Sequence, residues 1–190
     1  MAGVLNSASA KGHTDIVKLL LEELKVDLCH NDGWSPLNSS SKDTDEKKNP
    51  NVDLCHNDGW SPLNSASAKG HTDIVKLLLE KNPNVDLCHN DGWSPLNSAS
   101  DKGHTDIVKL LLEKNPKSSD KGHTDIVKLL LEKNPNVDLC NNDGWSPLNS
   151  ASAKGHTDIV KLLLEKNPNV DLCNNDGWSP LNSASAKGHT

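Results

Sequence analysis

Hydrophobic residues in this chain gather in one short segment, IVKLLL, that recurs along the sequence. It occurs five times, beginning at residues 16, 74, 107, 126 and 159, and each copy is flanked by polar residues. In the copy at 74–79 the apolar positions cover two overlapping i, i+3, i+4 faces of a helix. So wide an apolar stripe predicts a helix that packs between neighbours on both sides.

The segment belongs to a longer unit with a period of 33 residues. Residues 57–89 and 142–174 differ only at the last position, where Asn174 replaces His89. A period between about 20 and 50 residues indicates a stacked array, in which each unit packs on its neighbours, rather than one globular core. The near identity of the copies indicates recent duplication.

Each unit begins with a predicted turn and a short helix. In the copy at 57–89, the pair Asp58-Gly59 predicts a tight turn because glycine accepts a positive φ. The pair Ser61-Pro62 predicts a helix start, since serine caps a helix and proline suits its first position.

The rest of the unit is predicted to hold a second helix and a return segment. Gly70 is placed to end the first helix, and Thr72 to cap the second with its side chain. Asn82 and Pro83 predict the end of the second helix, because asparagine tolerates a left-handed conformation and proline stops the helix. We expect residues 85–88 to run extended into the next turn.

The unit resembles the ankyrin repeat, whose consensus runs D-G-x-T-P-L-H, then A-A, G-H, I-V, L-L and G-A-x-V-N. The resemblance implies an all-α ankyrin-repeat solenoid of helix-turn-helix units, with β-hairpin-like turn segments, or fingers, along one side. In one copy the matching residues are Asp91, Gly92, Ser94, Pro95, Leu96, Gly103, His104, Ile107, Val108, Leu110 and Leu111.

The copies share several departures from that consensus. Serine replaces the threonine, and asparagine replaces the histidine, as at Asn64 and Asn97. In the family, these two residues tie neighbouring repeats together by hydrogen bonds, so we expect weaker ties in this chain. The second alanine of the pair becomes Ser67 and its equivalents, which adds to an expected loss of stability.

The solenoid is interrupted by one shortened and one expanded repeat. After the NDGWSPLN copy at 31–38 the IVKLLLE segment is missing, and we expect 39–52 to be disordered or irregular. Residues 117–135 duplicate a second helix, which predicts a helical hairpin of about 106–114 and about 125–133. We expect both faults to kink or split the stack and to leave the apolar face of residues 16–21 short of a partner.

These features divide the chain into three parts. Residues 1–30 form a partial N-terminal repeat, and residues 31–56 a defective repeat without its second helix, which acts as an irregular bridge. Residues 57–190 form an array with the helical insertion at 117–135 and a truncated final repeat. Because the sequence starts and stops inside a repeat, we expect a fragment of a longer array or an imperfectly assembled gene.

Composition excludes several classes of protein. The net charge is −6 and the 20 basic residues are all lysines without a basic run, which argues against nucleic-acid binding. No apolar run approaches the roughly 20 residues of a membrane span. The odd number of five cysteines, each at the same place in its copy, predicts free thiols and a reducing, cytoplasmic location.

Residue types typical of metal and catalytic sites occur, but their placement predicts neither. Equivalent residues of stacked repeats lie about 10 Å apart, too far for adjacent Cys-His pairs such as Cys88-His89 to share one ion. Asn141 and Asn174 also replace the histidine in two copies. Serine, histidine and aspartate recur as S-A-S-x-K-G-H-T-D, where caps, turns and helix starts explain each one. We therefore expect no enzyme, no cofactor and no small-molecule substrate.

Tryptophan is the only aromatic residue type, and one occurs in each NDGWSPLN copy. The resemblance places it on the finger, facing the concave groove in which ankyrin proteins bind partners. A large aromatic residue at such a position is typical of interface hot spots. Alternatively, each tryptophan packs on its own finger and helix. The predicted protein-binding residues are Trp60, Trp93, Trp145, Trp178, Asn90, Asp91, Asp101 and Lys102.

The resemblance and these residues predict a non-catalytic scaffold that binds a partner protein through the groove and fingers. An acidic groove would suit a partner with basic or apolar character. Two other interpretations stay open. The chain could be the targeting segment of a larger enzyme or channel, or a degenerate array without specific function.

Overall fold

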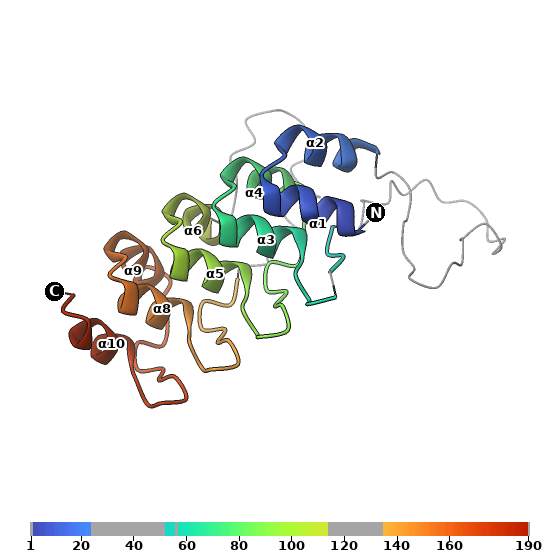
Figure 1. Cartoon of the computed structure of the whole chain (residues 1–190). Helices are drawn as coiled ribbons and strands as arrows, with labels where there is room; N and C mark the ends of the chain where they lie inside the picture. Colours follow the sequence, from blue (N-terminus) through green and yellow to red (C-terminus); the bar gives the residue numbers. More distant parts are fainter. Residues whose placement is uncertain (1, 24–51, 56, 114–134, 190) are drawn as a thin grey trace, which may run out of the picture.

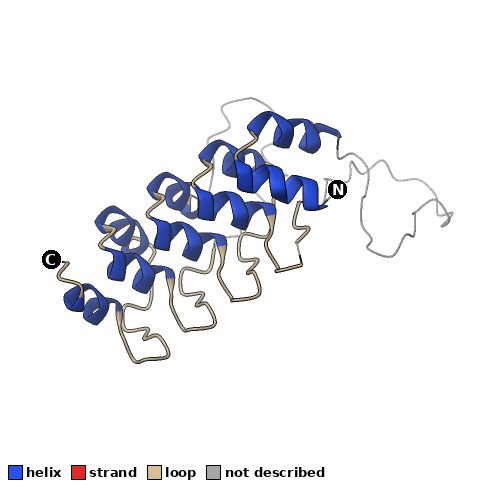
Figure 2. Cartoon of the chain, in the orientation of Figure 1, coloured by secondary structure: helices blue, strands red, loops and turns tan. Residues whose placement is uncertain are grey.

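The structure, a computed structural model, describes residues 2–23, 52–55, 57–113 and 135–189. Within these ranges it holds nine α-helices and no strand, and the helices form two rows with hairpin-like segments along one side (Figures 1 and 2). The first row contains α1 (Ala2–Lys11), α3 (Pro62–Lys69), α5 (Pro95–Lys102), α8 (Pro147–Lys154) and α10 (Pro180–Ala186). The second row contains α2 (Thr14–Glu23), α4 (Thr72–Leu79), α6 (Thr105–Leu112) and α9 (Thr157–Leu164).

First-row helices start and end as predicted. At α5, the Ser94 hydroxyl accepts a hydrogen bond from the backbone N–H of Asn97 at 3.1 Å, and Pro95 occupies the first turn. Gly103 ends the helix at a φ of 75°, in the left-handed region that favours glycine. The same cap and glycine frame α3 and α8.

Second-row helices begin differently from the prediction. The expected side-chain cap at Thr72 is wrong, because His71 occupies the cap position and makes no capping hydrogen bond through its side chain. Only Gly70 and His71 separate the two helices, and the backbone N–H of Thr72 donates to the carbonyl of Gly70 at 3.0 Å. At the other end, Asn82 adopts the predicted left-handed conformation with a φ of 54°.

The return segment forms a turn and does not run extended, so that prediction is also wrong. The Leu87 N–H donates to the carbonyl of Asn84 at 3.3 Å. The Asn84 side-chain oxygen accepts from the Asp86 N–H at 3.1 Å. An asparagine side chain that bonds two residues ahead favours a turn over a strand.

The core lies between the two rows and between successive repeats. Ile74, Val75 and Leu78 of α4 are buried, as the wide apolar stripe predicted, and α4 contacts both α2 and α6. Leu63 and Ala66 of α3 are buried in the first row. Each repeat is therefore stabilised mainly by its neighbours.

The stack is continuous across both sequence irregularities, which corrects the expectation of a kinked or split array. Helix α1 packs on α3, and α5 packs on α8, as α3 packs on α5 (Figure 1). The helix pairs on either side of each irregularity carry the same contact residues and therefore pair directly. Two segments, 24–51 and 114–134, lie outside the described residues. They contain most of the defective repeat and the extra helix predicted at about 125–133.

Helix α2 packs on α4, so its apolar face has a partner after all. Val17 and Leu21 are buried and Leu20 packs against the core. Ile16 and Leu19 remain exposed, as the sequence led us to expect of the whole face.

Candidate functional site

The fingers at 89–93, 141–145 and 174–178 are tight hairpins that end at a tryptophan. In the finger at 89–93 the Gly92 N–H donates to the carbonyl of His89 at 2.8 Å, and the His89 N–H donates to the carbonyl of Trp93 at 3.2 Å. Gly92 has a φ of 80°, as a three-residue hairpin loop requires at its last position. The loop thus holds the backbone of Trp93 where the finger meets α5.

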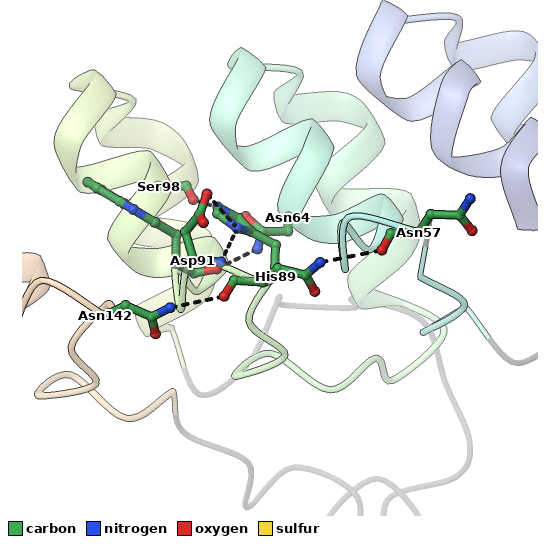
Figure 3. A network of polar contacts seen from close by, with 8 residues as sticks. Asn57, Asn64, His89, Asp91, Ser98 and Asn142 are labelled. Atoms are coloured by element: carbon green, nitrogen blue, oxygen red, sulfur yellow. Dashed lines mark hydrogen bonds and ion pairs between the residues drawn. The ribbon is translucent and has the colours of Figure 1, made fainter.

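Neighbouring fingers are joined by asparagine. The Asn90 N–H donates to the carbonyl of Asp58 at 3.1 Å. The Asn142 side chain donates to the carbonyl of Asn90 at 3.0 Å, and the Asn142 N–H to that of Asp91 at 3.0 Å (Figure 3). Asn90, predicted as a binding residue, therefore joins one finger to the next.

A second set of hydrogen bonds fixes the tryptophan backbone from the preceding repeat. The Asn64 amide donates to the carbonyl of Trp93 at 2.6 Å and accepts from the Ser98 hydroxyl at 2.9 Å (Figure 3). Asn97 and Asn149 make the same two bonds to the repeats that follow them. The ties between repeats are therefore present at this asparagine, because its amide provides both a donor and an acceptor, and their expected weakening relative to the family stays a prediction.

The finger position of residue 89 is occupied by histidine in some repeats and by asparagine in others, and both residue types support the finger. The His89 Nδ1 accepts from the Asp91 N–H at 3.1 Å, and its ring stacks on Trp60 with centroids 4.2 Å apart. Burial lowers the pKa of His89, only partly opposed by the Asp91 carboxylate, which favours the neutral ring. At the equivalent position, the Asn141 side-chain oxygen accepts from the Asp143 N–H at 3.1 Å. Either residue type supplies the acceptor that the finger needs.

The histidines at the inter-helix turns also have structural partners. The His104 Nε2 lies 3.3 Å from the carbonyl of Ala68, and the His156 Nε2 lies 3.1 Å from that of Asp101. Each ring packs over a glycine of the preceding repeat, as His156 does at Gly103. Among the described residues, no group of three or more histidine, cysteine, aspartate or glutamate side chains could hold a metal ion.

Four cysteines lie in the described part of the chain, and all are free thiols: Cys55, Cys88, Cys140 and Cys173. The Cys88 thiol donates to the carbonyl of Asp86 at 3.4 Å. Burial raises the pKa of Cys88 and Cys140, and the carboxylates of Asp86 and Asp138 raise it further. These thiols are therefore poor nucleophiles at neutral pH.

Three equivalent hollows lie between the fingers and the first-row helices. They measure about 220 Å³ between Trp60 and Trp93, about 340 Å³ between Trp93 and Trp145, and about 320 Å³ between Trp145 and Trp178. A serine of a first-row helix lines each hollow: Ser98, Ser150 or Ser183. We call this row of three hollows the groove.

The groove carries opposite charges on its two sides. A finger aspartate lines each hollow on one side: Asp91, Asp143 or Asp176. A lysine from the end of a first-row helix lines each on the other: Lys102, Lys154 or Lys187. Asp91 is 83% exposed, whereas Asp101 is 14% exposed and its carboxylate lies 2.9 Å from the Lys102 ammonium.

The structure brings seven of the eight predicted binding residues to the groove: Trp60, Trp93, Trp145, Trp178, Asp91, Asp101 and Lys102. Trp60, Trp93 and Trp145 are half-buried and Trp178 is 45% exposed. The prediction omitted the equivalents of Asp91 and Lys102 in later repeats, which the period of the sequence could have identified. Trp60 also contacts His89 of the next finger, so part of its surface serves packing.

Comparison with known families agrees with the repeat architecture. A family model described as Ankyrin repeats (3 copies) matches residues 46–121 and 117–190. A search of curated proteins finds no match to the chain. In the described ranges, no helix is long and apolar enough to cross a membrane.

Proposed function

Because the chain belongs to the ankyrin repeat family, we propose that it is a non-catalytic scaffold that binds a partner protein through the groove. Ankyrin repeats generally mediate protein–protein interactions. One observation supports this proposal above the others: each of the three hollows is walled by two tryptophans that keep part of their surface exposed.

The tryptophans suit this function because their backbone is held before a partner arrives. The Trp93 carbonyl is bonded both within its finger and to Asn64 of the preceding repeat. A side chain on a fixed backbone loses little conformational freedom on binding, which favours affinity. Exposed aromatic surface at the centre of a groove is typical of binding hot spots.

We further propose that the scaffold works in the reducing cytoplasm. Free cysteines in repeated positions suit that compartment. The exposed finger aspartates favour a partner with basic character, and the tryptophans favour one with apolar surface.

A retention experiment tests the groove. The chain and its double variant Trp93→Ala/Trp145→Ala would be immobilised and exposed to cytoplasmic extract. The variant Lys109→Ala/Lys161→Ala, with changes at exposed positions on the second-row helices, serves as the matched control. We expect retained proteins to be lost with the tryptophan variant and kept with the lysine variant. Equal retention by all three would overturn the proposal, provided that circular dichroism shows the same helix content.

Tryptophan accessibility provides an independent check. If the groove is open, acrylamide quenches the fluorescence of Trp93 and Trp145. Their emission is obtained by subtracting the spectrum of the double variant Trp93→Ala/Trp145→Ala from that of the unchanged chain. Blue-shifted emission that acrylamide does not quench would show that the rings are buried and unavailable.

A further inference from the structure

The groove repeats the same chemical pattern at every junction. Each hollow has two tryptophan walls, an aspartate on the finger side and a lysine on the helix side. Because the repeats stack through their helices, equivalent groups follow one another at about 8 to 10 Å, the packing distance of helices. A partner that contacts several hollows in the same way must present the same group at that interval.

Among regular backbone conformations, a polyproline II helix meets this condition with a single extended strand of peptide. It has three residues per turn and a rise of about 3.1 Å, so the same face returns after about 9 Å. In a β-strand, residues three apart are separated by about 10 Å but point to opposite faces. An α-helix returns after seven residues, about 10.5 Å, but it has a diameter of about 10–12 Å with its side chains.

The indole groups also favour a polyproline II ligand over an α-helix. Within the described residues, the indole N–H groups of Trp93 and Trp145 donate to no acceptor, although both rings line the hollows. Polyproline II backbone makes no internal hydrogen bonds, so its carbonyls are free to accept from these donors. The carbonyls of an α-helix are already bonded within the helix. Aromatic-lined grooves are a known mode of recognising this conformation.

The charges indicate which side chain the ligand carries at its repeated position. The carboxylates of Asp91, Asp143 and Asp176 are exposed, and among the described residues none has a lysine partner; the nearest basic group is His89 Nδ1, 3.8 Å from the Asp91 carboxylate. On the opposite side, Lys102 is paired with Asp101, whereas Lys154 and Lys187 have no acidic partner among the described residues, because Ala153 and Ala186 stand in place of Asp101. The finger side of the groove thus carries three exposed carboxylates, and it favours a basic side chain of the ligand on that side.

We propose that the groove binds an extended segment of a partner protein in the polyproline II conformation, with lysine or arginine at every third position. The basic side chains contact the finger aspartates, and the prolines between them pack on the tryptophans. This proposal rests on the proposed function, since it names the kind of segment that the scaffold would bind.

Synthetic peptides test the period directly. The probe is (Pro-Pro-Lys)₅, and its control is an isomer with the same composition in which the five lysines are contiguous. We expect the probe to bind at least about tenfold tighter, measured by calorimetry at about 0.15 M salt, where long-range attraction between exposed charges is largely screened. Absence of probe binding, equal affinity for the isomer, or tighter binding of a helical peptide with lysine every seventh residue would overturn the proposal.

Matched variants test the contacts. Asp91→Asn/Asp143→Asn/Asp176→Asn should weaken probe binding about eightfold to tenfold, since each exposed charge pair contributes about twofold. Glu80→Gln/Glu113→Gln/Glu165→Gln makes the same charge change at exposed positions after the second-row helices and should alter affinity by less than about twofold. Equal effects of the two triple variants would show attraction to net charge alone and would overturn the proposal. If the probe fails but retention in extract still depends on Trp93 and Trp145, the scaffold function stands and only this inference falls.

Discussion

The Ser150 hydroxyl donates a hydrogen bond to Asn97 Oδ1 at 3.0 Å, although the two residues are 53 positions apart. The equivalent bond from Ser98 to Asn64 measures 2.9 Å across 34 positions. The junction between α5 and α8 therefore has the geometry of the junction between α3 and α5, despite a longer intervening chain. Its structure depends on the residues that meet there and not on their separation along the sequence.

Loss of this asparagine should destabilise the array at one junction. Asn97→Ala leaves the buried Ser150 hydroxyl without its acceptor and removes one of the two donors to the Trp145 carbonyl, which keeps the Asn141 N–H. We expect a decrease of about 1–3 kcal/mol in the free energy of unfolding, the cost of one buried polar group left unpaired. Urea unfolding followed by circular dichroism measures it.

The last repeat provides the control for that substitution. Asn182 is the exposed equivalent of Asn97, and its side chain makes no hydrogen bond within the described residues. Asn182→Ala should change stability by less than about 0.5 kcal/mol, as is usual at exposed positions. A similar loss for both variants would show that the cost does not come from the inter-repeat bonds.

Two serines of α5 should respond to alanine in opposite directions. The Ser100 hydroxyl is buried without a hydrogen-bond partner, so Ser100→Ala should raise stability by about 0.5–1 kcal/mol through better helix propensity and loss of an unpaired group. Ser98→Ala removes the bond to Asn64 and should lower stability by about 1 kcal/mol. Thermal unfolding of the two variants checks the signs, and a lower Tm for Ser100→Ala would contradict the prediction.

Alanine substitutions at two glycines distinguish the cost of a strained backbone conformation from the cost of a clash with the next repeat. Gly103 has a φ of 75°, and an added methyl group would lie 2.8 Å from the His156 ring. Gly188 has a φ of 74° with nothing within 4 Å. Gly188→Ala should therefore cost about 1–2 kcal/mol for the left-handed conformation alone, and Gly103→Ala should cost more. Equal losses in urea unfolding would show that the His156 ring moves aside freely.

Acid should destabilise the array partly through His89. Burial lowers the pKa of His89 below the ordinary value of 6.5, so the unfolded chain binds a proton more readily than the folded one. The stabilising contribution is full above pH 6.5 and is lost as pH falls through the lower folded pKa. His89→Asn, which copies Asn141 and Asn174, should lose less stability between pH 7.5 and pH 5. Parallel urea midpoints across this range would show that His89 does not contribute.

Local features of the fold followed from the sequence, because their causes lie within a few residues. The turn at Gly92 and the cap at Ser94 each depend on one side chain and its immediate neighbours. The hydrogen bonds of Asn64 could not be derived in this way, since both of its partners lie in the next repeat. The cap predicted at Thr72 failed because the helix starts one residue earlier than expected, with His71 at the cap position and Thr72 already in the first turn.

The candidate site was predicted in outline for a similar reason. The resemblance located Trp93 and Asp91 on the finger, and both line the groove. Asn90, next to Asp91 in the sequence, was predicted to bind a partner as well. Instead, its side-chain amide donates to the Asn57 carbonyl and its backbone N–H donates to the Asp58 carbonyl of the adjacent finger. Which of two neighbouring polar residues faces a groove depends on how the fingers pair, and this is visible only in three dimensions.

The uniform junctions have a genetic consequence. Any complete helix pair offers the same asparagine, serine, histidine and glycine to whichever pair follows, so unequal crossing-over between near-identical copies yields proteins whose repeats still stack. Each copy gained or lost adds or removes one hollow. The number of copies thus sets the length of the groove and, under the binding mode proposed above, the avidity for a repetitive ligand.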